Sequence, residues 1–184
     1  MTLTKTPICN FGEKAKDFNL KSVENKQISL KDINGENGAL VMFICNHCPY
    51  VKAIIKDLVD DVKFLESLGV KSVGIMSNDV KNYPDDSFEN MISFSKLNKF
   101  SFPYLIDETQ DIAKKYGAVC TPDFFGFNKK MELQYRGRIR ELKDLKPVKT
   151  GDSDLKKAMK LIAETGNGPK NQIPSMGCNI KWFK

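Results

Sequence analysis

The first half of the chain alternates between two apolar patterns, and this alternation constrains the fold more than any other feature. Ala39–Cys45 is a continuous apolar run and Val70–Met76 is a second one, mostly apolar; both predict strands buried on both faces. Between them, apolar residues recur at helical spacing over residues 51–65, with Pro49 suited to the first helical turn and Gly69 to the helix end. Strand, helix and strand in this order predict parallel pairing with a right-handed crossover.

The rest of the chain continues this alternation and then adds antiparallel elements. We expect an extended arm and hairpin in 18–33, helices at 87–99, 109–116 and 154–164, a short strand at 102–106, and a hairpin of 124–127 with 132–135. These elements predict an α/β fold with a central mixed β-sheet flanked by helices on both faces. The length fits one domain, formed by residues 1–166, with 167–184 as a tail docked on it.

Composition and charge exclude several classes of protein. The longest apolar run is far shorter than the roughly 20 residues of a membrane helix, and residues 1–7 lack the apolar segment of a signal peptide. We therefore expect a cytoplasmic protein without a membrane partner. The net charge of +6 is concentrated in residues 129–160, where spread lysines are typical of a solvated face, so no nucleic-acid partner is expected. Within that stretch, Arg136, Arg138 and Arg140 occupy alternate positions, which predicts one polar face of a strand.

The cysteines carry the chemical signal. Five cysteines at irregular spacing do not indicate a disulfide framework. Cys45-Asn46-His47-Cys48, however, lies where a buried strand meets a helix, and the unpaired N–H groups and dipole of a first helical turn favour a thiolate. We expect Cys45 as the outer, attacking sulfur, Cys48 as the buried, resolving one, and His47 as a positive charge that favours the thiolate. No cofactor beyond this redox-active disulfide is expected.

Several longer motifs resemble those of a known family. They are Gly12–Phe18, Met42–Val51, Ser77–Asp79, Tyr83–Ser87, Phe102–Leu105, Asp107–Gln110, Cys120–Phe125 and Pro174–Trp182. Together they resemble the thioredoxin-like superfamily, and within it a bacterial group of peroxiredoxin-like proteins with a C-x-x-C motif, related to the alkyl hydroperoxide reductase and thiol-specific antioxidant proteins. The resemblance implies a thioredoxin-like fold with an N-terminal extension, an insertion and the C-terminal tail. It also implies that Thr121–Pro122 is a cis-proline turn that faces the C-x-x-C and can hold a substrate's extended chain.

Three functions remain open on these residues. In the thioredoxin alignment Cys45 attacks, and the protein is a thiol–disulfide oxidoreductase acting on protein or small-thiol substrates. In the peroxiredoxin alignment Cys48 is the peroxidatic cysteine of a thiol-dependent, antioxidant peroxidase. Such a site typically has a threonine three residues earlier, where this chain has Cys45, and a distant arginine near 120–122, where it has none. Thiol–disulfide exchange is therefore favoured, ahead of the peroxidase and of a metal-binding module that uses Cys45, His47 and Cys48.

Two further thiols and an acidic loop are secondary candidates. Cys120 lies two residues before Pro122, and Cys178 lies in the tail near the only tryptophan, so both are candidate accessory redox thiols. Asp85 or Asp86 is expected to cap the following helix. The oligomeric state, the substrate and the electron donor are not specified by these patterns.

Overall fold

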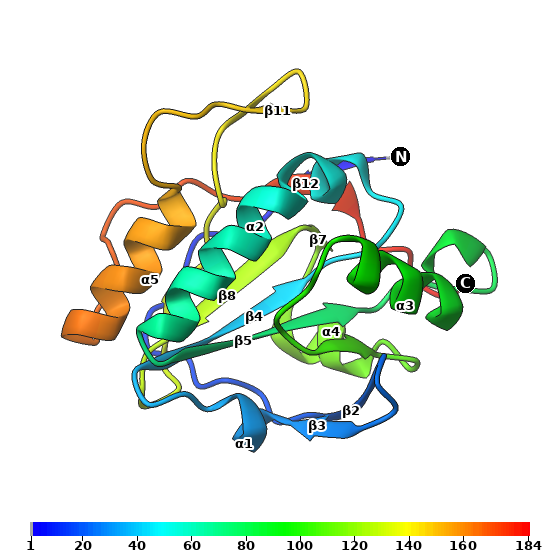
Figure 1. The fold of residues 1–184 in the computed structure, drawn as a ribbon, viewed down its shortest axis with the longest axis horizontal. Helices are drawn as coiled ribbons and strands as arrows, with labels where there is room; N and C mark the ends of the chain where they lie inside the picture. Colours follow the sequence, from blue (N-terminus) through cyan, green and yellow to red (C-terminus); the bar gives the residue numbers. More distant parts are fainter. Residues whose placement is uncertain (1) are drawn as a thin grey trace.

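The computed structural model describes residues 2–184, and a seven-stranded mixed sheet lies at its centre (Figure 1). The strand order is β3-β2-β6-β5-β4-β8-β9. Parallel pairing joins β4 (Gly38–Phe43), β5 (Val70–Met76) and β6 (Tyr104–Ile106). Antiparallel pairing adds β2 (Asn19–Ser22), β3 (Gln27–Ser29), β8 (Asp123–Phe127) and β9 (Leu133–Tyr135). The predicted α/β class and mixed sheet are confirmed.

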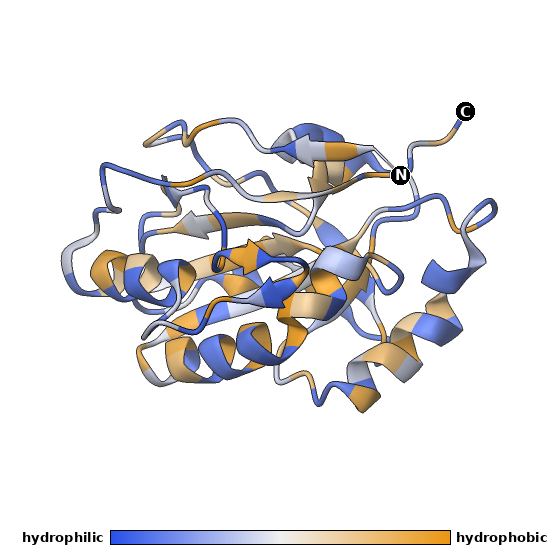
Figure 2. Ribbon diagram, turned by 90° about the horizontal axis from the view of Figure 1, so that it is seen from above, coloured by the Kyte–Doolittle hydropathy of each residue, from blue (hydrophilic) through white to orange (hydrophobic). Residues whose placement is uncertain are grey.

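Helices cover both faces of this sheet, which explains why its central strands are apolar throughout. One face packs against α2 (Pro49–Ser67), α3 (Phe88–Leu97) and α5 (Asp154–Thr165), and the other against α1 (Leu30–Ile33) and α4 (Asp111–Tyr116). In β4, Leu40 and Met42 belong to the first core, while Val41 and Phe43 belong to the second. The helices carry both hydrophobic and hydrophilic residues, as elements with one buried face do (Figure 2).

The C-terminal tail forms a second, three-stranded sheet that the sequence did not predict. In it β12 (Met176–Asn179) lies between β1 (Leu3–Lys5) and β7 (Cys120–Thr121), antiparallel to both. A small hairpin of β10 (Leu142–Lys143) and β11 (Lys146–Pro147) completes the strands, and a 3-10 turn, η1, covers Pro84–Asp86. Residues 167–184 therefore pack on the body formed by the rest of the chain. No helix within residues 2–184 combines the length and the apolar character needed to span a bilayer.

The predicted arginine-bearing strand face is wrong. Strand β9 ends at Tyr135, and the three arginines that follow it are each held by a carboxylate: Arg136 by Asp123 at 3.0 Å, Arg138 by Asp154 at 2.7 Å and Arg140 by Asp57 at 3.1 Å. Burial of a guanidinium requires such a partner, because an unpaired buried charge is costly. These side chains thus tie the irregular segment after β9 to the rest of the fold.

Candidate active site

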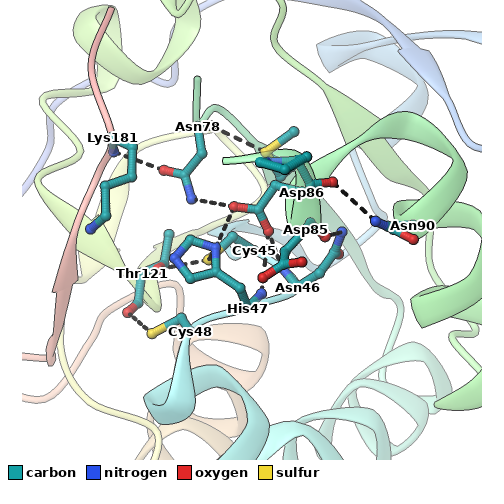
Figure 3. A network of polar contacts seen from close by, with 12 residues as sticks. Cys45, Asn46, His47, Cys48, Asn78, Asp85, Asp86, Asn90, Thr121 and Lys181 are labelled. Carbon is teal, nitrogen blue, oxygen red and sulfur yellow. Dashed lines mark hydrogen bonds and ion pairs between the residues drawn. The ribbon is translucent and has the colours of Figure 1, made fainter. Parts of the chain in front are cut away.

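The C-x-x-C segment lies between the end of β4 and the start of α2, as predicted. Cys48 is the N-cap residue of α2, and Pro49 is its first helical residue. The Thr121–Pro122 peptide bond is cis, as the resemblance implied, and this turn faces the two cysteines. Cys45 Sγ lies 3.3 Å from Thr121 Oγ1, and Cys48 Sγ lies 3.1 Å from the carbonyl oxygen of Thr121 (Figure 3). Four of the predicted site residues are therefore brought together.

The thiolate belongs to Cys48. Its pKa is lowered to about 5, chiefly by a hydrogen bond from the Cys45 thiol, and also by the backbone N–H groups of Cys178 and Val51. The Val51 N–H is one of the unpaired donors of the first turn of α2, so the helix stabilises the anion at its own N-cap. These contributions exceed the opposing effect of burial.

Cys45 remains protonated in this arrangement. Burial raises its pKa well above the usual value, and the hydrogen bond that it donates to Cys48 and the negative charge of Asp86 raise it further. The expectation that Cys45 is the outer sulfur is wrong, since neither cysteine has exposed surface (0% for both). The identity of the attacking sulfur stays a prediction. We expected the N–H groups at the start of the helix to favour a thiolate at Cys45, but they lower the pKa of Cys48.

His47 is held by a buried carboxylate, that of Asp86, for which the sequence predicted a helix cap as one of two candidates. Its Nδ1 lies 2.6 Å from Asp86 Oδ2, and the Asp86 side chain is fully buried. This hydrogen bond raises the pKa of His47. Burial alone would raise the pKa of Asp86, but hydrogen bonds from His47 and Asn78 bring it below its usual value. Both shifts favour the ion pair between the two side chains.

Asp86 also fixes the backbone of the C-x-x-C segment. Its Oδ1 accepts the N–H groups of Asn46 at 2.8 Å and of His47 at 3.2 Å. The expected helix cap is instead Ser87, whose hydroxyl accepts the N–H of Asn90, while Asp85 is exposed. The signal for Asp86 was its place in the Tyr83–Ser87 motif, but no spacing rule distinguishes it from Asp85.

The His47 imidazole connects the dithiol to the tail. Its Nδ1 lies 3.9 Å from Cys45 Sγ, so the imidazolium charge is close to the sulfur. On the other side, Asn78 donates to Asp86 at 2.8 Å and accepts the backbone N–H of Lys181 at 2.9 Å. Figure 3 shows this continuous path from the cysteines through Asp86 to the tail.

The structure separates the two accessory thiols. Cys178, in β12, is the antiparallel partner of Thr121, and its backbone N–H reaches Cys48. Cys120 directs its sulfur to the carbonyl of Pro122, 3.6 Å away. Burial raises the pKa of both thiols, that of Cys178 to about 12. The backbone of Cys178 thus contacts the dithiol, whereas the sulfur of Cys120 contacts the carbonyl oxygen of Pro122.

The donor set for a metal is incomplete. Within residues 2–184, one group of three ligating side chains lies together, Cys45, His47 and Asp86, with donor atoms within 4.8 Å of one another. Cys48, which the metal-binding hypothesis included, is not part of this group. A structural zinc site closes with four ligands, and Asp86 is already occupied by hydrogen bonds from His47, Asn46 and Asn78. These residues fit a dithiol site better than a metal centre.

A buried dithiol at a strand–helix junction, opposite a cis-proline turn on a mixed sheet of this order, defines a redox protein of thioredoxin-like fold. The chain belongs to the AhpC/TSA family, whose model matches residues 11–136. Both the recognised family and the predicted fold are thereby confirmed.

Several known proteins are similar to this chain. An uncharacterized conserved protein from Geobacillus kaustophilus is 36% identical, with a TM-score of 0.93 over 100% of this chain and 97% of that one. A hypothetical protein from Sinorhizobium meliloti 1021 is 32% identical, with a TM-score of 0.90 over 99% of both chains. The sporulation thiol-disulfide oxidoreductase A of Bacillus subtilis (strain 168) is 26% identical over 117 residues, which are 64% of this chain and 67% of that protein.

Proposed function

We propose that this protein is a thiol–disulfide oxidoreductase in which Cys48 is the nucleophile and Cys45 the resolving thiol. The observation that carries the proposal is the N-cap position of Cys48, where Val51, Cys178 and the Cys45 thiol all donate to its sulfur. In the first step the Cys48 thiolate attacks a substrate disulfide, forming a mixed disulfide and releasing one substrate thiolate. Cys45 then attacks Cys48, closes the Cys45–Cys48 disulfide and releases the second thiolate. Two electrons pass from the dithiol to the substrate.

The neighbouring charges assist the proton transfers. The Cys45 thiol must lose its proton before it attacks, and the His47–Asp86 pair lies against it. When the disulfide closes, the released substrate thiolate takes up that proton. The positive charge of His47 beside Cys45 favours this loss of the proton, and Asp86 orients the imidazole ring.

The burial of both sulfurs limits how a substrate reaches them. Since neither sulfur is exposed, exchange requires a local opening of the cover over the site. A pocket of about 260 Å³ lies beside the cis-proline turn and is lined by residues that include Tyr50, Pro122 and Met176. We infer that a substrate enters on this side and contacts Pro122, since the backbone of Thr121 is already paired with Cys178. The compartment that we propose is the cytoplasm, where thiols such as the buried Cys120 stay reduced.

The proposal is tested by comparing two oxidants. Reduced protein is mixed separately with oxidised glutathione and with hydrogen peroxide, and the rate of Cys45–Cys48 disulfide formation is followed by stopped flow. We expect exchange with the disulfide to be faster than that of free cysteine at pH 7, because a thiol with a pKa of about 5 is ionised there while one of 9.0 is about 1% ionised. The lower nucleophilicity of such a thiolate offsets part of this gain. Disulfide exchange no faster than that of free cysteine would refute the proposal.

Peroxide reduction is the second candidate, and the low pKa of Cys48 is the observation that favours it. A sulfenic acid on Cys48, closed by Cys45, gives the same disulfide. Against it, the guanidinium groups of Arg136, Arg138 and Arg140 are held by carboxylates. A peroxide rate far above the disulfide rate in the same experiment would make the antioxidant peroxidase the better assignment.

A further inference from the structure

The tail is built closely onto the cis-proline turn. The Ser175 hydroxyl donates to the carbonyl oxygen of Pro122 at 2.8 Å, and the next strand residues pair with β7. Gly177 lies so near this turn that a Cβ there would collide with the carbonyl oxygen of Thr121. The absence of a side chain at Gly177 is therefore what lets β12 approach the turn. The backbone that was expected to hold a substrate chain holds the protein's own tail.

The pairing of β12 with β7 places a third thiol, that of Cys178, beside the dithiol. Cys178 is paired with Thr121, whose carbonyl oxygen is 3.1 Å from Cys48 Sγ. Both the backbone N–H and the thiol of Cys178 interact with the Cys48 sulfur. Cys48 thus lies between two thiols, Cys45 on its own loop and Cys178 on the tail, and all three are buried in one cluster.

We propose that Cys178 is a third redox-active thiol, which exchanges with Cys45 as the disulfide partner of Cys48. This inference rests on the proposed function, which supplies the Cys45–Cys48 disulfide. The Cys178 thiolate attacks Cys48 Sγ; the Cys48–Cys178 bond forms and the Cys45–Cys48 bond breaks. Cys45 leaves as a thiolate and takes up the proton that Cys178 has lost. One disulfide replaces another, so no external oxidant or reductant is needed.

Oxidation of the dithiol itself prepares this step. In the reduced protein, the hydrogen bond to Cys48 and the negative charge of its thiolate are among the causes that keep Cys178 protonated, after burial. Once Cys48 is in a disulfide, both of these disappear, while the nearby Lys181 continues to favour the Cys178 thiolate. The exchange would tie β12 to the N-terminus of α2 and return Cys45 as a thiol beside His47.

Disulfide mapping of Cys45→Ser, oxidised with excess oxidised glutathione, tests this proposal. Trypsin leaves Cys45 and Cys48 in one peptide, 32–52, and Cys178 in another, 171–181, so a Cys48–Cys178 bond joins two peptides of known mass. We expect that joined pair as the main product. A Cys48 that remains bound to glutathione, with no joined pair, would overturn the proposal.

Three controls make the outcome specific. Cys178→Ser should form only the bond within peptide 32–52, and Cys120→Ser, which removes the other buried thiol of the same sheet, should leave the joined pair intact. A bond from Cys48 to Cys120 would contradict the proposal. The wild-type protein gives a second readout that needs no variant, because partial oxidation should yield the joined pair beside the Cys45–Cys48 bond. If Cys178→Ser neither forms that bond nor exchanges with disulfides, the proposed function fails instead.

Discussion

Replacing Cys48 with serine should lower the rate of the first exchange step with oxidised glutathione by at least about 100-fold at pH 7. The remaining thiol is Cys45, whose pKa burial and Asp86 hold well above the usual value, so little thiolate is left to attack. The measurement is the rate of mixed-disulfide formation, followed by mass spectrometry of acid-quenched samples.

The matched variant is Cys45→Ser, which removes the other sulfur of the pair. It should keep the first step, because the introduced hydroxyl can still donate to the Cys48 thiolate and the N–H groups of Val51 and Cys178 remain in place. The two variants therefore differ in which step they lose. If Cys48→Ser instead formed its mixed disulfide on Cys45 at the wild-type rate, the assignment of the nucleophile would be reversed.

Replacing Asp86 with alanine should destabilise the protein by about 3 kcal/mol at pH 7, because it leaves His47 and two backbone N–H groups without their buried partner. For a chain of this size that corresponds to a loss of about 6–12 °C in Tm. Thermal and denaturant unfolding of the reduced protein measure the effect. Exchange activity should fall with it, since Asp86 holds the segment that carries both cysteines.

The pH dependence of this loss distinguishes the carboxylate from mere packing. The folded pKa of Asp86 is depressed, so its contribution to stability is present above the unfolded value near 3.9 and is lost as the pH falls through the folded pKa. The difference between wild type and variant should therefore shrink in acid. Asp85→Ala, the same change at the exposed neighbour, should change Tm little. A loss of similar size at both positions would show that Asp86 has no special role.

The parts of the fold that follow local patterns could be predicted from the sequence. The run ending at Cys45, the helical spacing after Pro49 and the run from Val70 to Met76 each appear in the structure as β4, α2 and β5 with ends shifted by no more than two residues. These elements can be predicted because both faces of the sheet are covered and the helix is buried on one side. The pattern of apolar residues in each segment therefore reflects its burial.

What the sequence did not provide depends on partners far along the chain. Strand β12 has four residues and β7 has two, too few for any periodicity, and Cys178 meets Thr121 only because the tail folds back. The proposed choice of nucleophile also depends on such a distant partner, since the Cys178 N–H is among the groups that lower the pKa of Cys48. The prediction of a polar strand face formed by the three arginines was wrong for the same reason. Their charges are paired with Asp123, Asp154 and Asp57, which lie far along the chain or in other elements.

The most direct test of the central claim is the pH dependence of alkylation of the reduced protein by iodoacetamide, with the modified cysteine located by peptide mapping. A thiolate stabilised at the N-cap of α2 predicts that Cys48 is the cysteine modified first, with a rate that rises to a plateau around a midpoint near pH 5. Modification of Cys45 first, or a Cys48 midpoint near pH 9, would contradict the account.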